Sequence, residues 1–198
     1  MIELAPVGCK WNSPLLATRK PSKDGSPDGV RVCLDARALN DKILNIPDSN
    51  LPGIREIQDS LGEFEWITIL DLADSYHQFP INHSDRIKTT FTWGGKQWMF
   101  KGVPFGLKIM TGHMQRLMEI LVGKHGRLPF QDDIAIATKK GGDHVSDVLE
   151  VLKTLTYEAK LRLRLKKCQF FHIEARVLGS LVTRTGIKMD PLKIKAIA

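Results

Sequence analysis

The sequence Trp66-Ile-Thr-Ile-Leu-Asp-Leu72 places an aspartate inside an apolar run that is rich in β-branched residues. Such a run is typical of a strand that is buried on both faces. Two further acidic residues, Asp132 and Asp133, lie between two other apolar stretches, 128–130 and 134–137, and this order predicts a hairpin. Because burying an unpaired carboxylate costs several kcal/mol, acidic residues in these places call for an explanation.

Each acidic position also has an ordinary structural explanation. Asp132-Asp133 could form a hairpin turn, where aspartate is common, and Asp71 could cap the segment that follows its strand. If the two strands are neighbours, their backbones lie roughly 4.8 Å apart, and the carboxylates could hold two divalent cations about 3.5–4 Å apart. Such ions activate a hydroxyl nucleophile and stabilise leaving pyrophosphate, and oxygen ligands favour Mg²⁺. The residues alone do not decide whether the strands are adjacent.

The remaining pattern predicts an α+β layer fold, an antiparallel sheet with helices on one side and a free face for a ligand. Expected strand pairs are 14–18 with 30–34 around a turn at 23–26, 89–93 with 97–100 across Gly94-Gly95, and 177–182 with 187–189. Residues 161–166 alternate leucine with basic residues, which predicts a strand with one basic face. Expected helices follow Pro52 as far as Gly62, cover 114–121 up to Gly123, cover 145–155, and begin at Asp190-Pro191.

Composition limits the class of protein. The 198 residues, 42% hydrophobic and 26% charged, suffice for one core or for two small lobes. Lys and Arg number 29 against 22 Asp and Glu, and the formal net charge of +7 favours a polyanionic partner without establishing one. The three cysteines form no CxxC pair, so neither a disulfide framework nor a zinc site is indicated. No apolar stretch approaches the roughly 20 residues of a membrane span, and residues 1–11 lack a signal-peptide pattern, so we expect an intracellular protein without a membrane partner, in a cytoplasmic particle or the nucleus.

Eight blocks occur in a fixed order along the chain. They are RVCLDARALN (31–40), LDLADSYHQFPI (70–81), VPFGL (103–107), MQRLM (114–118), FQDDIAIAT (130–138), LKKCQFF (165–171), VLGSLV (177–182) and GIKMDPLKIKAI (186–197). From about Asn12 onward the chain resembles the reverse transcriptases of gypsy-type long-terminal-repeat retrotransposons. A lone Asp-Asp turn would be a weak signal, whereas eight blocks in order are specific and disfavour another palm-type polymerase.

The resemblance implies the fingers and palm of the right-hand polymerase fold. The fingers would be 1–46 and 79–109, the palm 47–78 and 110–198, and the thumb and ribonuclease H would be absent. The implied activity is RNA-directed DNA polymerisation, in which dNTPs are added to a primer 3′-hydroxyl by two-metal phosphoryl transfer with Mg²⁺, or with Mn²⁺. The implied partners are an RNA or DNA template, a DNA primer, and the rest of a Pol polyprotein with its thumb, ribonuclease H and integrase.

The resemblance also implies roles for individual residues. Asp71, Asp132 and Asp133 would be the catalytic metal ligands, joined by Leu72. Residues expected at the dNTP are Arg31 and Lys23, the segment Leu72, Ala73, Asp74 and Ser75 through its amides, Tyr76 as a steric gate against the 2′-hydroxyl, and Phe105. Residues expected at the template or primer are Gly106, Phe130 and Gln131. The competing interpretations are a solvated Arg31, a core role for Tyr76 and Phe105, and an ordinary solvated face for Arg162, Arg164, Lys166 and Lys167 in place of a phosphate-binding one.

The sequence departs from the family pattern at two places. Phe130-Gln131 stands where a tyrosine and an apolar residue usually precede the paired aspartates, and 108–111 read Lys-Ile-Met-Thr where Thr-Asn-Ala-Pro is usual. The chain ends where a thumb would begin, so we expect a piece of a polyprotein or a truncated derivative with a weak, salt-sensitive grip on nucleic acid. The alternative function is therefore a non-catalytic or domesticated fragment that binds nucleic acid or a protein partner.

Overall fold

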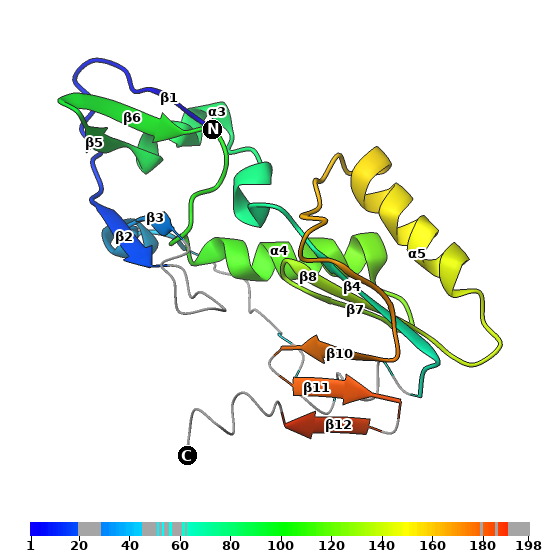
Figure 1. The fold of residues 1–198 in the computed structure, drawn as a ribbon. Coiled ribbons are helices and arrows are strands. Elements are labelled where there is room, and N and C mark those ends of the chain that lie inside the picture. Colours follow the sequence, from blue (N-terminus) through cyan, green and yellow to red (C-terminus); the bar gives the residue numbers. More distant parts are fainter. Residues whose placement is uncertain are drawn as a thin grey trace. The chain divides into compact units, whose positions relative to one another are not determined.

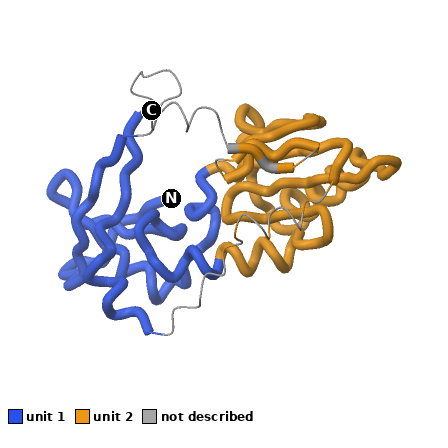
Figure 2. Tube along the Cα trace, turned by 90° about the horizontal axis from the view of Figure 1, so that it is seen from below, with its two compact units in different colours: residues 1–48, 74–113 blue, residues 49–73, 114–198 orange. Residues whose placement is uncertain are grey.

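A computed structural model describes residues 1–19, 29–44, 51, 53, 56, 61, 63–178, 180–184 and 186–189 (Figure 1). The chain forms two compact units, one from residues 1–48 and 74–113 and the other from residues 49–73 and 114–198 (Figure 2). We call them unit 1 and unit 2, and their assignment as fingers and palm stays a prediction. The predicted turn at 23–26, most of the helix after Pro52, and the helix start at Asp190-Pro191 lie outside the described residues.

A four-stranded antiparallel sheet forms the centre of unit 2, in the order β7-β8-β4-β9. Its strands are β4 (Trp66–Asp71), β7 (Arg127–Phe130), β8 (Asp133–Thr138) and β9 (Gln169–His172). The two apolar runs that carry the acidic residues are therefore neighbours, with a register that starts at Trp66 opposite Thr138 and ends at Asp71 opposite Asp133. The predicted strand at 66–72 and the predicted hairpin around Asp132-Asp133 are both confirmed.

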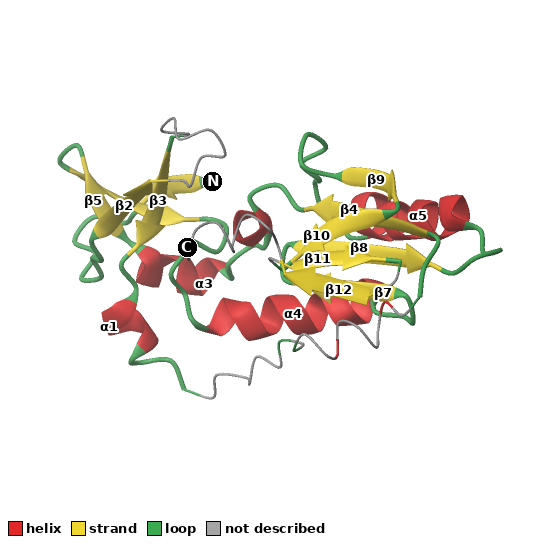
Figure 3. Ribbon diagram, turned by 60° about the horizontal axis from the view of Figure 1, so that its bottom comes forward, coloured by secondary structure: helices red, strands yellow, loops and turns green. Residues whose placement is uncertain are grey.

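The two faces of β4 are covered by different elements. Ile67 and Ile69 belong to an apolar cluster that includes Ala175 and Val182 of a second antiparallel sheet, formed by β10 (Glu174–Val177), β11 (Ser180–Thr183) and β12 (Gly186–Met189) (Figure 3). Thr68 points to the opposite face, where α5 (His144–Leu152) lies. The expectation of a free face is therefore wrong for this stretch of β4, because the second sheet buries it.

Helix α4 (Ile109–Val122) confirms the predicted helix at 114–121 and begins five residues earlier. Met114, Met118 and Val122, at spacings of four, are buried, and Gly123 ends the helix with its N–H donating to the carbonyl of Glu119 at 2.9 Å. Helix α5 confirms the helix predicted at 145–155 and continues as a π-helical turn, η3 (Lys153–Glu158). Within the described part of the chain, no helix is long and apolar enough to cross a membrane.

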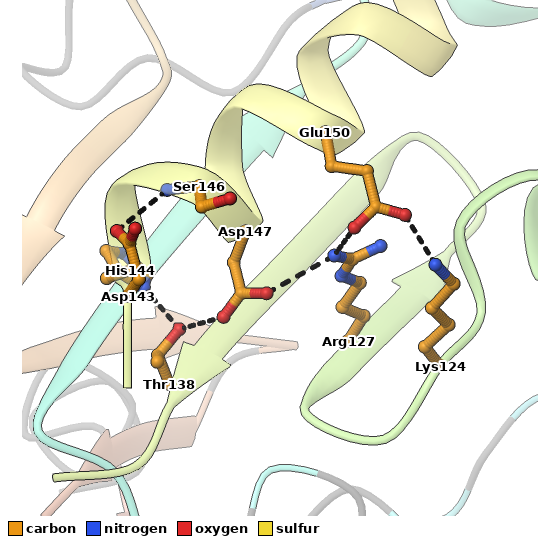
Figure 4. A network of polar contacts seen from close by, with 8 residues as sticks. All are labelled: Lys124, Arg127, Thr138, Asp143, His144, Ser146, Asp147 and Glu150. Atoms are coloured by element: carbon orange, nitrogen blue, oxygen red, sulfur yellow. Dashed lines mark hydrogen bonds and ion pairs between the residues drawn. The ribbon is translucent and has the colours of Figure 1, made fainter. Parts of the chain in front are cut away.

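A buried polar network holds α5 to the sheet (Figure 4). Thr138 donates its hydroxyl to Asp147 at 2.7 Å, so the contact between Thr138 and His144 Nδ1, also 2.7 Å, requires the ring to donate there. Nε2 then accepts from Thr68 at 2.8 Å, and the Thr68 oxygen accepts from the Phe171 N–H at 3.2 Å. Burial lowers the pKa of His144, in agreement with a neutral ring that serves as donor on one side and acceptor on the other.

The same network ends in a cluster of ion pairs. Arg127, whose side chain is 7% exposed, donates to Asp147 at 3.3 Å and to Glu150 at 2.5 Å. Lys124 also binds Glu150. The hydrogen bond from Arg127, followed by that from Lys124, lowers the pKa of Glu150 to about 2. Helix α5 is thus connected to β4, β7 and β8 by polar groups that are mutually satisfied.

Two predicted strands differ from the structure. Residues 161–166 pair only at Leu163, which forms an isolated bridge with Leu72. Lys160 has a φ of +56° before this point and a turn follows at 165–167, so the extended stretch is too short to be a strand although its residues alternate. The predicted hairpin of 177–182 with 187–189 is confirmed for β11, which pairs with β12. Its first strand is interrupted, however, because β10 ends at Val177 and the next residue, Leu178, has a φ of +51°.

Unit 1 contains a three-stranded antiparallel sheet in the order β1-β6-β5 and a separate pair, β2-β3. The strands are β1 (Ile2–Leu4), β2 (Leu15–Arg19), β3 (Val30–Leu34), β5 (Phe91–Trp93) and β6 (Lys96–Phe100). Both predicted strand pairs are confirmed, and Gly94 and Gly95 have φ of 59° and 72°, as a tight primed turn requires. Short helical segments complete the unit: α1 (Arg37–Asn40), η1 (Ser75–Gln78), α3 (His83–Arg86) and η2 (Ile87–Thr89).

Candidate active site

The backbones of three aspartates of unit 2 lie at one end of the central sheet. Asp71 is the last residue of β4, Asp133 is the first residue of β8, and the register places them directly opposite each other. Asp132 precedes Asp133, and its carbonyl accepts from the Leu72 N–H at 2.9 Å. Hydrogen bonding between two central strands therefore brings together carboxylates that lie about 60 positions apart in the sequence.

The local charge makes this end of the sheet unfavourable for a further anion. Burial, followed by the negative charges of Asp132 and Asp71, raises the pKa of Asp133 to about 6, and Lys167 acts in the opposite direction. The Lys167 ammonium lies 3.9 Å from Oδ2 of Asp71, whose side chain is 14% exposed. The site therefore has an excess of negative charge that a bound cation would reduce.

The donor set suits a hard divalent cation, because it consists of carboxylate oxygens on adjacent backbones. Among the described residues, however, no three acidic, histidine or cysteine side chains are arranged so that they could together hold a metal ion. The backbone positions of the three aspartates and the chemistry of their carboxylates fit Mg²⁺. Their side chains, however, do not point to one common position in this structure. The metal-ligand roles of Asp71, Asp132, Asp133 and Leu72 stay predictions.

The segment 164–168, which precedes β9, makes contacts with Asp71 that were not predicted from the sequence. Arg164 donates its N–H to the Asp71 carbonyl at 2.8 Å, and Asp71 donates its own N–H to the Cys168 sulfur at 3.4 Å. Lys167 and Cys168 belong to the LKKCQFF block, and Arg164 directly precedes it. The clue was available in the sequence, since this block is one of the eight, but its basic residues were assigned to a strand face instead.

Three of the residues predicted at the nucleotide lie together in unit 1. The Phe105 ring is the common partner: its centroid is 5.3 Å from that of Tyr76 and 5.1 Å from the Arg31 guanidinium carbon. The Phe105 carbonyl accepts from the Leu34 N–H at 3.1 Å. Gly106 has a φ of +111°, and a Cβ there would lie 2.3 Å from the Leu34 carbonyl oxygen, so only glycine fits. Tyr76, Phe105 and Arg31 thus form one aromatic–cationic cluster, and their roles at the nucleotide stay predictions.

Four successive amides, those of Leu72, Ala73, Asp74 and Ser75, are predicted to contact a triphosphate. The N–H groups of Leu72 and Ala73 donate within unit 2, to the carbonyls of Asp132 and Arg162, both at 2.9 Å. Asp74 has a φ of +46°, and a left-handed residue next to right-handed ones is the geometry in which successive amides form an anion nest. The contacts of these amides with a triphosphate stay a prediction. Lys23 lies outside the described residues.

The fold, the acidic strand ends and the order of the blocks are those expected of a reverse transcriptase domain. The family described as "Reverse transcriptase (RNA-dependent DNA polymerase)" matches residues 18–188, and the chain belongs to this family. It is 35% identical to the retrovirus-related Pol polyprotein from transposon gypsy of Drosophila melanogaster, over 98% of this chain and 19% of that polyprotein. The corresponding polyprotein from transposon 297 of the same organism is also 35% identical, over 94% of this chain and 18% of its own length. The predicted resemblance to gypsy-type elements is confirmed, and the chain spans about a fifth of these relatives.

Solved structures give the same class of fold. The foamy viral protease–reverse transcriptase in complex with double-stranded DNA, in a form designated dRH, is 25% identical with a TM-score of 0.86, and covers 99% of this chain and 33% of that one. The complex of the foamy viral enzyme with an RNA/DNA hybrid is 26% identical with a TM-score of 0.74, over 94% of this chain and 25% of that one. The polymerase fold predicted from the sequence is confirmed at this level.

Proposed function

We propose that this chain adds dNTPs to the 3′-hydroxyl of a primer annealed to an RNA or DNA template, and that units 1 and 2 are its fingers and palm. The observation that carries the proposal is the pairing of Asp71 with Asp133 at the end of β4 and β8, with Asp132 beside them. Family membership supports the reaction class, and the foamy viral complexes with DNA and with RNA/DNA hybrid support the kind of partner.

In this proposal the aspartates hold two Mg²⁺ ions. Bound there, the ions would lower the pKa of the primer hydroxyl and neutralise charge on the leaving pyrophosphate. Asp71 and Asp132 would be the main ligands of the ions, with Asp133 in support. The raised pKa of Asp133 supports this role, because it reflects an excess of negative charge that a cation would reduce. Lys167 places one positive charge beside Asp71.

The cluster in unit 1 would select the nucleotide. The Arg31 guanidinium binds the α- and β-phosphates, and the Tyr76 ring excludes a ribose 2′-hydroxyl. Packing of Tyr76 and Arg31 on Phe105 supports this assignment, because a gate must be held rigidly to exclude by overlap. Phe130 and Gln131 would face the primer end, without the hydroxyl that a tyrosine would offer.

The direct test is primer extension by the purified chain on an RNA template, with Mg²⁺ at low salt. We expect extension by the wild type and its loss in Asp132→Asn, whose side chain keeps its shape but loses its charge. Asp41→Asn, an exposed aspartate of unit 1, is the matched control and should extend as well as the wild type. Full activity of Asp132→Asn would refute the catalytic assignment, and a wild type that binds duplex without extending it would favour the non-catalytic alternative.

A further inference from the structure

The connection between β7 and β8 is a two-residue loop, Gln131-Asp132, in a demanding conformation. Gln131 has a φ of +54°. Residues with a Cβ rarely adopt this region, and two-residue hairpin loops usually meet the requirement with Gly, Asn or Asp. Gln131 directly precedes the two proposed metal ligands Asp132 and Asp133, so its backbone conformation determines the direction in which they leave the strand.

A buried glutamine from α4 holds this loop. The Gln115 side chain is 3% exposed, and its Oε1 accepts from the Gln131 N–H at 2.9 Å. Its Nε2 donates to the Pro129 carbonyl at 2.9 Å. One amide thus binds the backbone on both sides of Phe130, at the outer edge of β7, which is an edge strand of the sheet that the described residues form.

The orientation of the Gln115 amide follows from its partners. Nε2 also donates to Oε1 of Glu119 at 2.9 Å, so two acceptors lie on one side of the amide and one N–H donor on the other. The reversed orientation would put the amide oxygen against both acceptors. Gln115 therefore cannot release Gln131 by a simple flip, and Glu119, one turn along α4, fixes it.

We propose that Gln115 is a positioning residue for the polymerase reaction: it keeps Gln131 left-handed and so directs Asp132 and Asp133 toward their ligands. The inference rests on the proposed function of these aspartates and adds to it a residue that touches neither nucleotide nor metal. A buried polar residue among the apolar positions Met114 and Met118 needs hydrogen-bond partners, and two of the partners of Gln115 are backbone groups where the chain enters the catalytic turn.

The test uses Gln115→Leu, which keeps the volume and removes the donors and the acceptor. Amide hydrogen exchange of Gln131 should accelerate at least about tenfold, since its acceptor is lost. The kcat for single-dNTP addition should fall at least about tenfold while the KM for dNTP changes less than about threefold, because the effect lies on the chemical step. Adding Gln131→Gly should restore kcat at least about threefold, because glycine adopts positive φ without a partner.

Val122→Ala is the matched control, because it creates a cavity at a buried position two turns further along the same helix. It should lower stability and leave kcat within about twofold of the wild type. Unchanged exchange at Gln131, faster exchange with unchanged kcat, no rescue by Gln131→Gly, or an equal kcat loss in Val122→Ala would each overturn the role of Gln115. If instead Asp132→Asn keeps full activity, or the wild type does not extend a primer, the proposed function fails, and exchange at Gln131 alone then decides whether Gln115 holds the turn.

Discussion

Replacing Asp133 by asparagine should make the metal-free protein more stable at neutral pH. Asp133 begins β8 beside Asp132 and opposite Asp71. Burial and these two negative charges raise its pKa to about 6. At pH 8 the folded state must therefore keep an ionised group in an unfavourable place, and asparagine has nearly the same shape without the charge.

The sign and the magnitude both follow from the raised pKa. A pKa raised on folding adds stability that is fully present below the ordinary value of 3.8 and is lost as pH rises through about 6. A pKa of about 6 in place of 3.8 corresponds to about 3 kcal/mol of folding free energy, at 1.36 kcal/mol per pKa unit. Because Asp133 is only partly buried, solvent screening reduces the expected gain of Asp133→Asn at pH 8 to about 1–2 kcal/mol.

The measurement is urea unfolding in EDTA, followed by circular dichroism at pH 8 and at pH 4.5. We expect the midpoint of Asp133→Asn to exceed that of the wild type at pH 8, with a much smaller difference at pH 4.5, where the wild-type carboxyl is protonated. Asp41→Asn, on the exposed surface of unit 1, should show no comparable gain. A variant that is no more stable than the wild type at pH 8, or a gain that is the same at both pH values, would refute the reasoning.

Three further predictions concern the nucleotide, the template and α5. Tyr76→Val should raise use of rNTP relative to dNTP at least about tenfold in single-nucleotide extension, because a clash is removed; an unchanged ratio would show that the ring is no gate. Neutralising Arg162 and Lys166 should lessen the log–log salt slope of duplex binding by about one to two units, whereas an unchanged slope would assign both to solvated surface. Because burial lowers the pKa of His144, the wild type should lose stability relative to His144→Gln as pH falls below the ordinary histidine value of 6.5; urea unfolding at pH 7.5 and 5.5 tests this, and equal pH dependence would contradict it.

The sequence predicted the strands of the site better than the way they meet. The apolar runs around Asp71 and Asp133 are long enough to determine strands, because side chains buried on both faces leave little ambiguity. Their adjacency depends on contacts between distant segments, which no local pattern encodes, and only the order of the family's blocks pointed to it. Gln115 was missed for the same reason: its partners are backbone groups of another element, and polarity on a buried helix face was the sole local signal.

The wrong predictions came from short segments whose ends were not recognised. Residues 161–166 alternate as a strand does, yet the left-handed Lys160 and the turn that follows leave room for one bridge at Leu163. The apolar stretch 177–182 reverses after Val177, where Leu178 adopts a φ that leucine rarely takes. Periodicity reports which side of an element is buried, but where an element ends depends on backbone conformations that non-glycine residues adopt only with tertiary support.

In the strand pair β4–β8, the residues that destabilise the pairing and the residues that stabilise it lie at different ends. At one end Asp71 faces Asp133, and their repulsion opposes the pairing of the strands. Toward the other end, Thr68 and Thr138 bind the two nitrogens of one histidine, His144, so the hydrogen bonds are complete only when both threonines face α5. A slip of one residue would turn one threonine away from the ring and one aspartate to the opposite face of the sheet. The hydrogen bonds to His144 therefore favour the register that places Asp71 opposite Asp133, and they do so away from the acidic end of the two strands.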